Sequence, residues 1–201
     1  MKKISALLCS LAAVFALVGC SKGTEVSAED FAAKAAQIQE KTYSSAVIEF
    51  DIDTESDHNG EKDSFKKDGK IEVTFEGTEA KAGSNEDAKV LDRLDMYFDE
   101  KMVDVIGEIA GQSDYYKALG VDVKTQYYVD PFGFTMEGSG SYEKAGEGSG
   151  SVSCDLYIRF NDYGWVELVD MEFEAKGTSI YEGVSYSSSE KMNVEFSVEY
   201  K

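Results

Sequence analysis

The sequence MNVEFSVEY, residues 192–200, alternates an apolar with a polar side chain at every step. A period of two is typical of a β-strand with one buried and one solvated face, because successive side chains point to opposite sides of the sheet. Similar patterns recur upstream as far as residue 121. The candidate strands are residues 121–129, 132–143, 151–160, 165–176, 178–187 and 190–200.

Short turns separate these candidate strands and determine their direction. The turns are predicted at Asp130–Pro131, Ala145–Gly150, Asn161–Gly164 and near Gly177. A parallel return needs a crossover of a dozen residues or more, so strands joined by such short turns must be antiparallel. The segment from residue 121 onward therefore predicts an antiparallel meander.

The segment before the meander predicts a hairpin and two helices. Alternation around residues 48–52 and 71–75 indicates two strands, with the polar stretch Thr54–Asp63 as their turn. Apolar residues three or four apart indicate a helix over residues 28–41 and a longer amphipathic helix over residues 86–110.

Smaller signals refine the ends of these helices. Ser27 is placed to cap the first helix, with Asp30 three residues on in a capping-box role. Residues 113–119 predict a further short helix, which Gly120 would close. Residues 77–85, between the hairpin and the longer helix, read as a loop.

The expected fold class is α+β. About eight strands with one apolar face need a cover for that face. Two amphipathic helices are too few to cover a flat sheet of this size. We therefore expect a large curved antiparallel sheet, a half-barrel, with the N-terminal helix and the inserted helix packed on its concave face.

The N-terminus has the sequence pattern of an export signal. Lys2 and Lys3 precede an apolar run from Ile4 to Val18 that is too short to span a bilayer, and these are the proportions of a signal peptide. The stretch Leu17-Val18-Gly19-Cys20 then resembles the lipobox of bacterial lipoproteins. The resemblance implies removal of residues 1–19 and lipidation of Cys20, which would anchor the chain to a membrane of the cell envelope.

Removal of the signal leaves residues 20–28 as lipidated cysteine and tether, and residues 29–201 as a single domain. The net charge of the chain would move from -19 to -21. So negative a protein disfavours nucleic acid as a partner. Cys154 becomes the one cysteine with no role in export, so no internal disulfide forms, and its apolar surroundings predict a small buried side chain.

The order helix, strands, inserted helix and long run of strands is similar to that of LolA-like and LppX-like carrier lipoproteins. This resemblance implies an incomplete barrel that holds an acyl chain or a lipid beneath helices. It rests on architecture and transfers no binding residue. The expected cavity lining is the apolar stripe of the inserted helix: Leu91, Leu94, Phe98, Met102 and Ile106.

An acidic stretch in the predicted hairpin turn provides a weak candidate metal site. Glu55, Asp57, Asn59 and Asp63 have the spacing of oxygen ligands in an EF-hand-like calcium loop. Lys66 stands where the loop requires a bidentate glutamate, and strands flank the segment instead of helices. We therefore expect a solvated hairpin tip, and we expect neither a metal nor a cofactor.

Catalytic signatures are weak throughout. His58 is the only histidine, and neither Cys154 nor any serine lies in a recognisable nucleophile motif. The sequence therefore favours a non-catalytic binding protein anchored through Cys20. Two hypotheses remain: a hydrophobic or lipid-like ligand held in a cavity of the curved sheet, or an envelope or cell-surface protein bound by the sheet as a scaffold.

Overall fold

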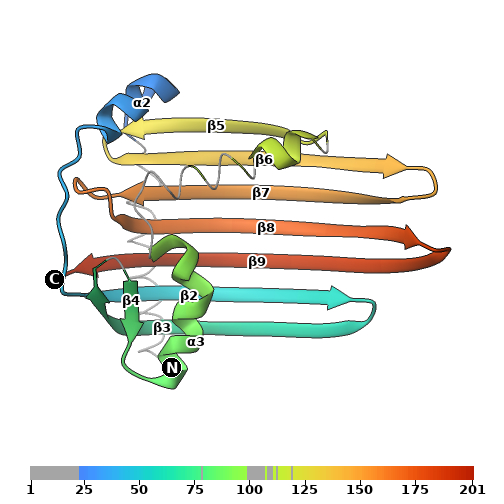
Figure 1. The fold of residues 1–201 in the computed structure, drawn as a ribbon, viewed down its shortest axis with the longest axis horizontal. Coiled ribbons are helices and arrows are strands. Elements are labelled where there is room, and N and C mark those ends of the chain that lie inside the picture. The colour runs from blue at the N-terminus through green and yellow to red at the C-terminus, as the bar shows by residue number, and fades with distance from the viewer. Residues whose placement is uncertain (1–22, 78, 99–106, 108–110, 112, 119) are drawn as a thin grey trace, which may run out of the picture.

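The computed structural model describes residues 23–77, 79–98, 107, 111, 113–118 and 120–201. They form one sheet of nine strands, in which all neighbouring strands are antiparallel (Figure 1). The strands are β1 (Glu25–Val26), β2 (Ser45–His58), β3 (Glu61–Glu76), β4 (Glu79–Ala82), β5 (Asp122–Val129), β6 (Phe132–Lys144), β7 (Gly148–Phe160), β8 (Val166–Tyr181) and β9 (Val184–Tyr200). The helices are α2 (Ala28–Ala35) and α3 (Asn85–Phe98), and residues 113–118 are also helical.

The strand order across the sheet is β1-β5-β6-β7-β8-β9-β2-β3-β4. The consecutive strands β5 to β9 form an antiparallel meander, as the sequence predicts. The C-terminal strand β9 then pairs with β2, where Phe196 stands opposite Phe50, and so joins the meander to the N-terminal hairpin. Because β1 and β4 lie at opposite edges, the sheet is open and does not close into a barrel.

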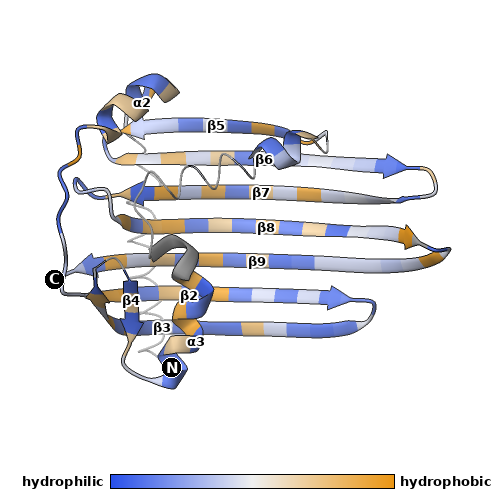
Figure 2. Cartoon of the chain, in the orientation of Figure 1, coloured by the Kyte–Doolittle hydropathy of each residue, from blue (hydrophilic) through white to orange (hydrophobic). Residues whose placement is uncertain are grey.

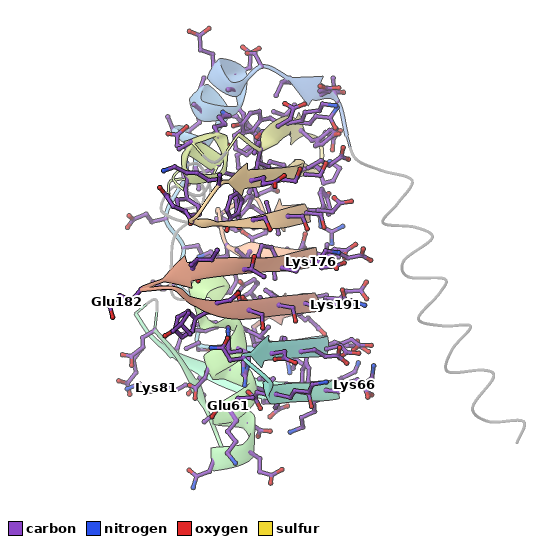
Figure 3. The ribbon with its side chains drawn as sticks, turned by 90° about the vertical axis from the view of Figure 1, so that its right-hand side faces the viewer. Glu61, Lys66, Lys81, Lys176, Glu182 and Lys191 are labelled. Carbon is purple, nitrogen blue, oxygen red and sulfur yellow. The ribbon has the colours of Figure 1, made fainter. Side chains whose placement is uncertain are left out.

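Alternation along the strands gives the sheet two unlike faces. On β9, the side chains of Val194, Phe196 and Val198 are buried on one side, which we call the apolar face. Glu195 lies between them on the other side, which we call the polar face. Figure 2 shows the alternation along the strands, and Figure 3 shows α2 and α3 on one side of the sheet, with Lys66, Lys176 and Lys191 on the other.

The described helices pack on the apolar face. On α3, Val90, Leu91 and Leu94 are buried in the same cluster as the apolar residues of the strands. On α2, the ring of Phe31 stacks on Phe132 at a centroid distance of 4.6 Å. No helix of the described residues is long and apolar enough to cross a bilayer.

The first helix begins where the sequence predicts. The Ser27 hydroxyl oxygen accepts a hydrogen bond of 3.1 Å from the backbone N–H of Asp30, which confirms the predicted cap. The helix ends earlier than expected, at Ala35 instead of near residue 41. The residues that follow cross the strand ends, where Trp165 Nε1 donates a hydrogen bond of 2.8 Å to the carbonyl oxygen of Lys41.

The hairpin of β2 and β3 is longer than the sequence predicts. Both strands run through most of the stretch expected to be a turn, so the turn itself is only Asn59-Gly60. Both residues have positive φ, as a two-residue hairpin turn requires. The tip is also tied to β9, because the Asn59 side-chain oxygen accepts a hydrogen bond of 2.7 Å from the backbone N–H of Ser187.

The predicted turn near Gly177 is wrong, because β8 continues through it to a turn at Glu182-Gly183. Gly177 and Gly150 stand opposite each other in neighbouring strands. A side chain at Gly150 would come within 2.7 Å of the Tyr142 ring. Glycine here makes room for an aromatic ring within the sheet, a role that sequence alone does not distinguish from a turn.

The sequence does not predict two short strands. β1 lies within the expected tether and β4 within the expected loop, while the expected strand 178–187 is divided between β8 and β9, so nine strands replace the expected eight. β1 has only two residues, and the alternation Glu-Ala-Lys-Ala of β4 is too short to predict a strand. Each exists because it pairs with an edge of the sheet: β1 with β5, and β4 with β3.

Candidate binding face

The residues expected to line a cavity are only partly described. Leu91 and Leu94 are buried in the core beneath α3. The side chain of Phe98, together with Met102 and Ile106, lies outside the described residues, and so does Cys20. A hollow of about 90 Å³ lies beside α3, where Arg93 meets residues of β2 and β9.

The candidate metal residues do not share a site. Glu55 and Asp57 lie on the polar face of β2, whereas Asp63 lies on β3 opposite Ser56 and so belongs to the other face. Asp57 accepts a hydrogen bond of 2.7 Å from the backbone N–H of Gly60, and Asn59 is engaged with β9. Among the described residues, no three His, Cys, Asp or Glu side chains are placed to hold a metal ion.

Cys154 packs against the core, as its pattern predicts. Burial, with the nearby charge of Asp155, raises the pKa of its thiol to about 11. The thiol is therefore protonated at neutral pH, and a protonated thiol is a poor nucleophile. His58 is exposed at the far end of β2.

The register brings three acidic side chains of adjacent strands together on the polar face. Glu137 of β6 stands opposite Asp155 of β7, and Asp155 stands opposite Glu172 of β8. At about 4.8 Å between strands, this row of carboxylates is about 10 Å long. The row continues to Lys124 on β5 and to Asn193 on β9.

An open hollow of about 390 Å³ follows this row and the adjacent row, and we call it the acidic groove. It crosses five strands, β5 to β9. Its ionisable lining consists of five carboxylates and two lysines: Asp122, Glu137, Asp155, Glu172, Glu174, Lys124 and Lys191. Ser139, Ser153 and Asn193 add uncharged hydrogen-bonding groups.

The polar face of the neighbouring β2–β3 hairpin has a different charge arrangement. There each of three carboxylates has a lysine across the strand pair. The pairs are Glu49 with Lys70 at 2.8 Å, Asp53 with Lys66, and Asp57 with Lys62 at 3.9 Å. Opposite charges across a strand pair stabilise a sheet by a few tenths of a kcal/mol, up to about 1 kcal/mol each.

The acidic groove is less well paired: Lys124 stands opposite Glu137 and Lys191 opposite Glu174, but neither lysine forms an ion pair with that acid. In the described part of the chain, Glu137, Asp155 and Glu172 have no basic group within 4.0 Å, and of the acids in the groove Glu174 pairs with Lys176 at 3.6 Å. Like charges on neighbouring strands repel one another. With five carboxylates against two lysines, the groove therefore keeps a negative potential that the sheet neutralises only in part.

A second acidic row lies beside the groove. Glu195 of β9 stands between Asp51 of β2 and Asp170 of β8. Partial burial, followed by the charges of Asp170 and Asp51, raises the pKa of Glu195 to about 7. This row extends the negative surface from the groove toward the hairpin.

Near the turn between β5 and β6, the side chains of the polar face are closely packed. Tyr128 is 6% exposed and Thr135 is 3% exposed, and burial raises the pKa of the neighbouring Tyr157. Arg159 Nε lies 2.9 Å from a carboxylate oxygen of Glu167, close enough for an ion pair but without the alignment of a hydrogen bond. These side chains fill that part of the face, and the groove lies farther along the strands.

Sequence reasoning predicted that acidic residues would occupy the solvated positions of the strands, but it did not identify the groove. Glu137, Asp155 and Glu172 each fall on the polar phase of a predicted strand. Which of them stand opposite one another depends on where the turns fall.

Comparison of the chain with protein-family models, with curated proteins and with solved structures gives no match.

Proposed function

We propose that this chain is a non-catalytic lipoprotein, anchored to the cell envelope through Cys20, that uses the polar face of its sheet to bind another macromolecule. The observation that carries the proposal is the acidic groove. Its central carboxylates, Glu137, Asp155 and Glu172, are exposed and, among the described residues, have no basic group within 4.0 Å, while three carboxylates on the neighbouring hairpin are paired with lysines. A partner with the opposite charge would relieve the repulsion.

The position of β1 supports anchoring with the sheet close to the membrane. Val129 donates a backbone hydrogen bond of 3.3 Å to Thr24, so the chain joins the sheet from that residue on. Gly23 fits there because a side chain would overlap the carbonyl oxygen of Asp130. Gly23 is three residues after Cys20, so a lipid on Cys20 would hold the end of β5 beside Asp130 within about 11 Å of the bilayer surface.

The test is photo-crosslinking in the cells that make the protein. A photoreactive residue at Ser153, in the acidic groove, should give discrete crosslinked products. The same residue at Lys89, on the exposed side of α3, is the matched control and should give few. Equal crosslinking from both positions, or none from Ser153, would contradict the proposal.

The anchor is tested separately. If Cys20 carries the lipid, the variant Cys20→Ser should no longer be found in the membrane fraction.

A hydrophobic ligand held between the helices and a half-barrel is the second candidate. It is favoured by the apolar stripe of α3, which faces the sheet through Leu91 and Leu94 and continues in sequence toward Phe98 and Met102. Native mass spectrometry of gently purified protein should then show an added lipid-like mass. A spectrum of the unliganded chain alone would count against this candidate.

A further inference from the structure

We propose that the acidic groove binds an extended polypeptide segment rich in lysine or arginine. This inference rests on the proposed function and specifies the chemistry of the partner. Three properties of the groove carry it: its length, the position of its uncompensated charges, and the uncharged polar groups between them.

The length of the groove suits a short extended segment. The groove crosses five strands, and four intervals of about 4.8 Å make it about 19 Å long. An extended chain advances about 3.3 Å per residue, so about six residues would fill the groove. A single metal ion or a small organic cation would occupy only part of this length.

The charges define where a cationic side chain would lie. The uncompensated carboxylates Glu137, Asp155 and Glu172 occupy the three central strands. Lys124 lies on the β5 side of this row, and Lys191 lies on β9 in the adjacent row. The basic side chains of a bound segment would therefore reach the central strands, and the two lysines would discourage a cationic segment from extending beyond the groove.

The uncharged groups favour a peptide over a simple polycation. Ser139 and Ser153 face each other across β6 and β7, and Asn193 stands beside Glu172. Hydroxyl and amide groups can donate to and accept from the backbone amides of a peptide. A polyamine has no carbonyl groups to use them, and a nucleic acid would be repelled by the carboxylates.

The test uses the full-length chain in a neutral detergent and a rhodamine-labelled peptide of alternating lysine and serine. Binding is followed by fluorescence anisotropy at low salt, about 50 mM, because screening weakens such contacts. The triple variant Glu137→Gln, Asp155→Asn, Glu172→Gln should weaken binding about tenfold, as expected for three exposed charge contacts of roughly 0.5 kcal/mol each.

The matched control removes three charges from the same face of the β2–β3 hairpin, where the carboxylates are paired with lysines. The variant Glu49→Gln, Asp53→Asn, Asp57→Asn should weaken binding by no more than about threefold, since its lysines already neutralise those acids. Equal weakening by both triple variants would overturn the inference, because binding would then follow net charge alone. Absence of peptide binding, or binding of spermine with the same affinity and the same dependence on the groove, would also overturn it.

Folding and the proposed function are checked separately. The three groove acids are exposed, so the variant should unfold at nearly the wild-type temperature, and the single change Asp155→Asn should still weaken binding about twofold. If the peptide fails to bind while Ser153 still gives crosslinks in cells, the polar face binds a partner that is not cationic. Loss of those crosslinks would instead contradict the proposed function itself.

Discussion

The surroundings of Glu195, on the polar face, make the stability of the chain depend on pH. Its carboxylate lies between Asp51 and Asp170 in the register and is partly buried. These effects raise its pKa from the ordinary value of 4.5 to about 7. The folded chain therefore holds a proton on Glu195 at pH values where the unfolded chain has released it. Stability from this group is complete below about pH 4.5 and is lost as the pH rises through 7.

Replacing Glu195 by glutamine should make the chain more stable at high pH. The variant has no ionising group at this position, so the cost of an ionised carboxylate disappears. We expect a gain in the free energy of unfolding of about 1 kcal/mol at about pH 8, after allowance for solvent screening of a group that is partly exposed, and almost none at about pH 5. Urea unfolding at the two pH values measures the difference.

Glu199 supplies the control for this prediction. It lies on the polar face of the same strand, but its partner on β2 is Val47 instead of an acid. Glu199→Gln removes the same charge without relieving a cross-strand repulsion, so its effect should be small at both pH values. A pH-independent effect of Glu195→Gln would show that neither burial nor the neighbouring carboxylates raise the pKa of Glu195.

At the scale of elements, the sequence predicts which segments are strands better than where they end. The meander and the cap of α2 follow from local pattern, because alternation and capping involve residues close in sequence. The ends of β2, β3, β8 and β9 do not, because pairing with a neighbour extends a strand through polar residues that have no alternation. Gly177 illustrates this: its neighbours in space, not in sequence, explain its presence.

A substitution that creates a cavity beneath the centre of α3 tests the packing of this helix on the sheet. Leu94 is completely buried. Leu94→Ala should lower the free energy of unfolding by about 3 kcal/mol, the usual cost of removing a buried leucine side chain. Chemical denaturation measures this change.

Lys89, on the exposed surface of α3, provides the comparison. Lys89→Ala should change the free energy of unfolding by less than about 0.5 kcal/mol, because no buried contact is lost. If Leu94→Ala were as mild as Lys89→Ala, α3 would not contribute to the core in the way described.

At the scale of the whole molecule, the face of the sheet that forms the core is distinct from the face proposed to bind a partner. The apolar face forms the core with the helices, whereas the polar face is open along the acidic groove. With a lipid on Cys20, the end of β5 beside Asp130 would lie near the bilayer, and the groove would cross the sheet from β5 to β9 farther along the strands. A partner in the envelope could then approach from the side of the sheet.

The sequence predicts the acidic, outward-facing residues of the candidate site but not their arrangement. The excess of acidic residues and their outward phase on each strand are visible in the sequence. The grouping of Glu137, Asp155 and Glu172 is not, because they are far apart in the chain and meet only through the register of three strands. The absence of lysine partners for them also depends on that register.

Carboxylate footprinting in intact cells tests the central claim most directly. A carbodiimide and a small amine would label accessible acids, and mass spectrometry would compare cells with purified protein. We expect Glu137, Asp155 and Glu172 to react readily in the purified protein and to be protected in cells, while Glu86, exposed on α3, reacts equally in both. Equal labelling of the groove acids in cells and in purified protein would contradict a role for the polar face in binding.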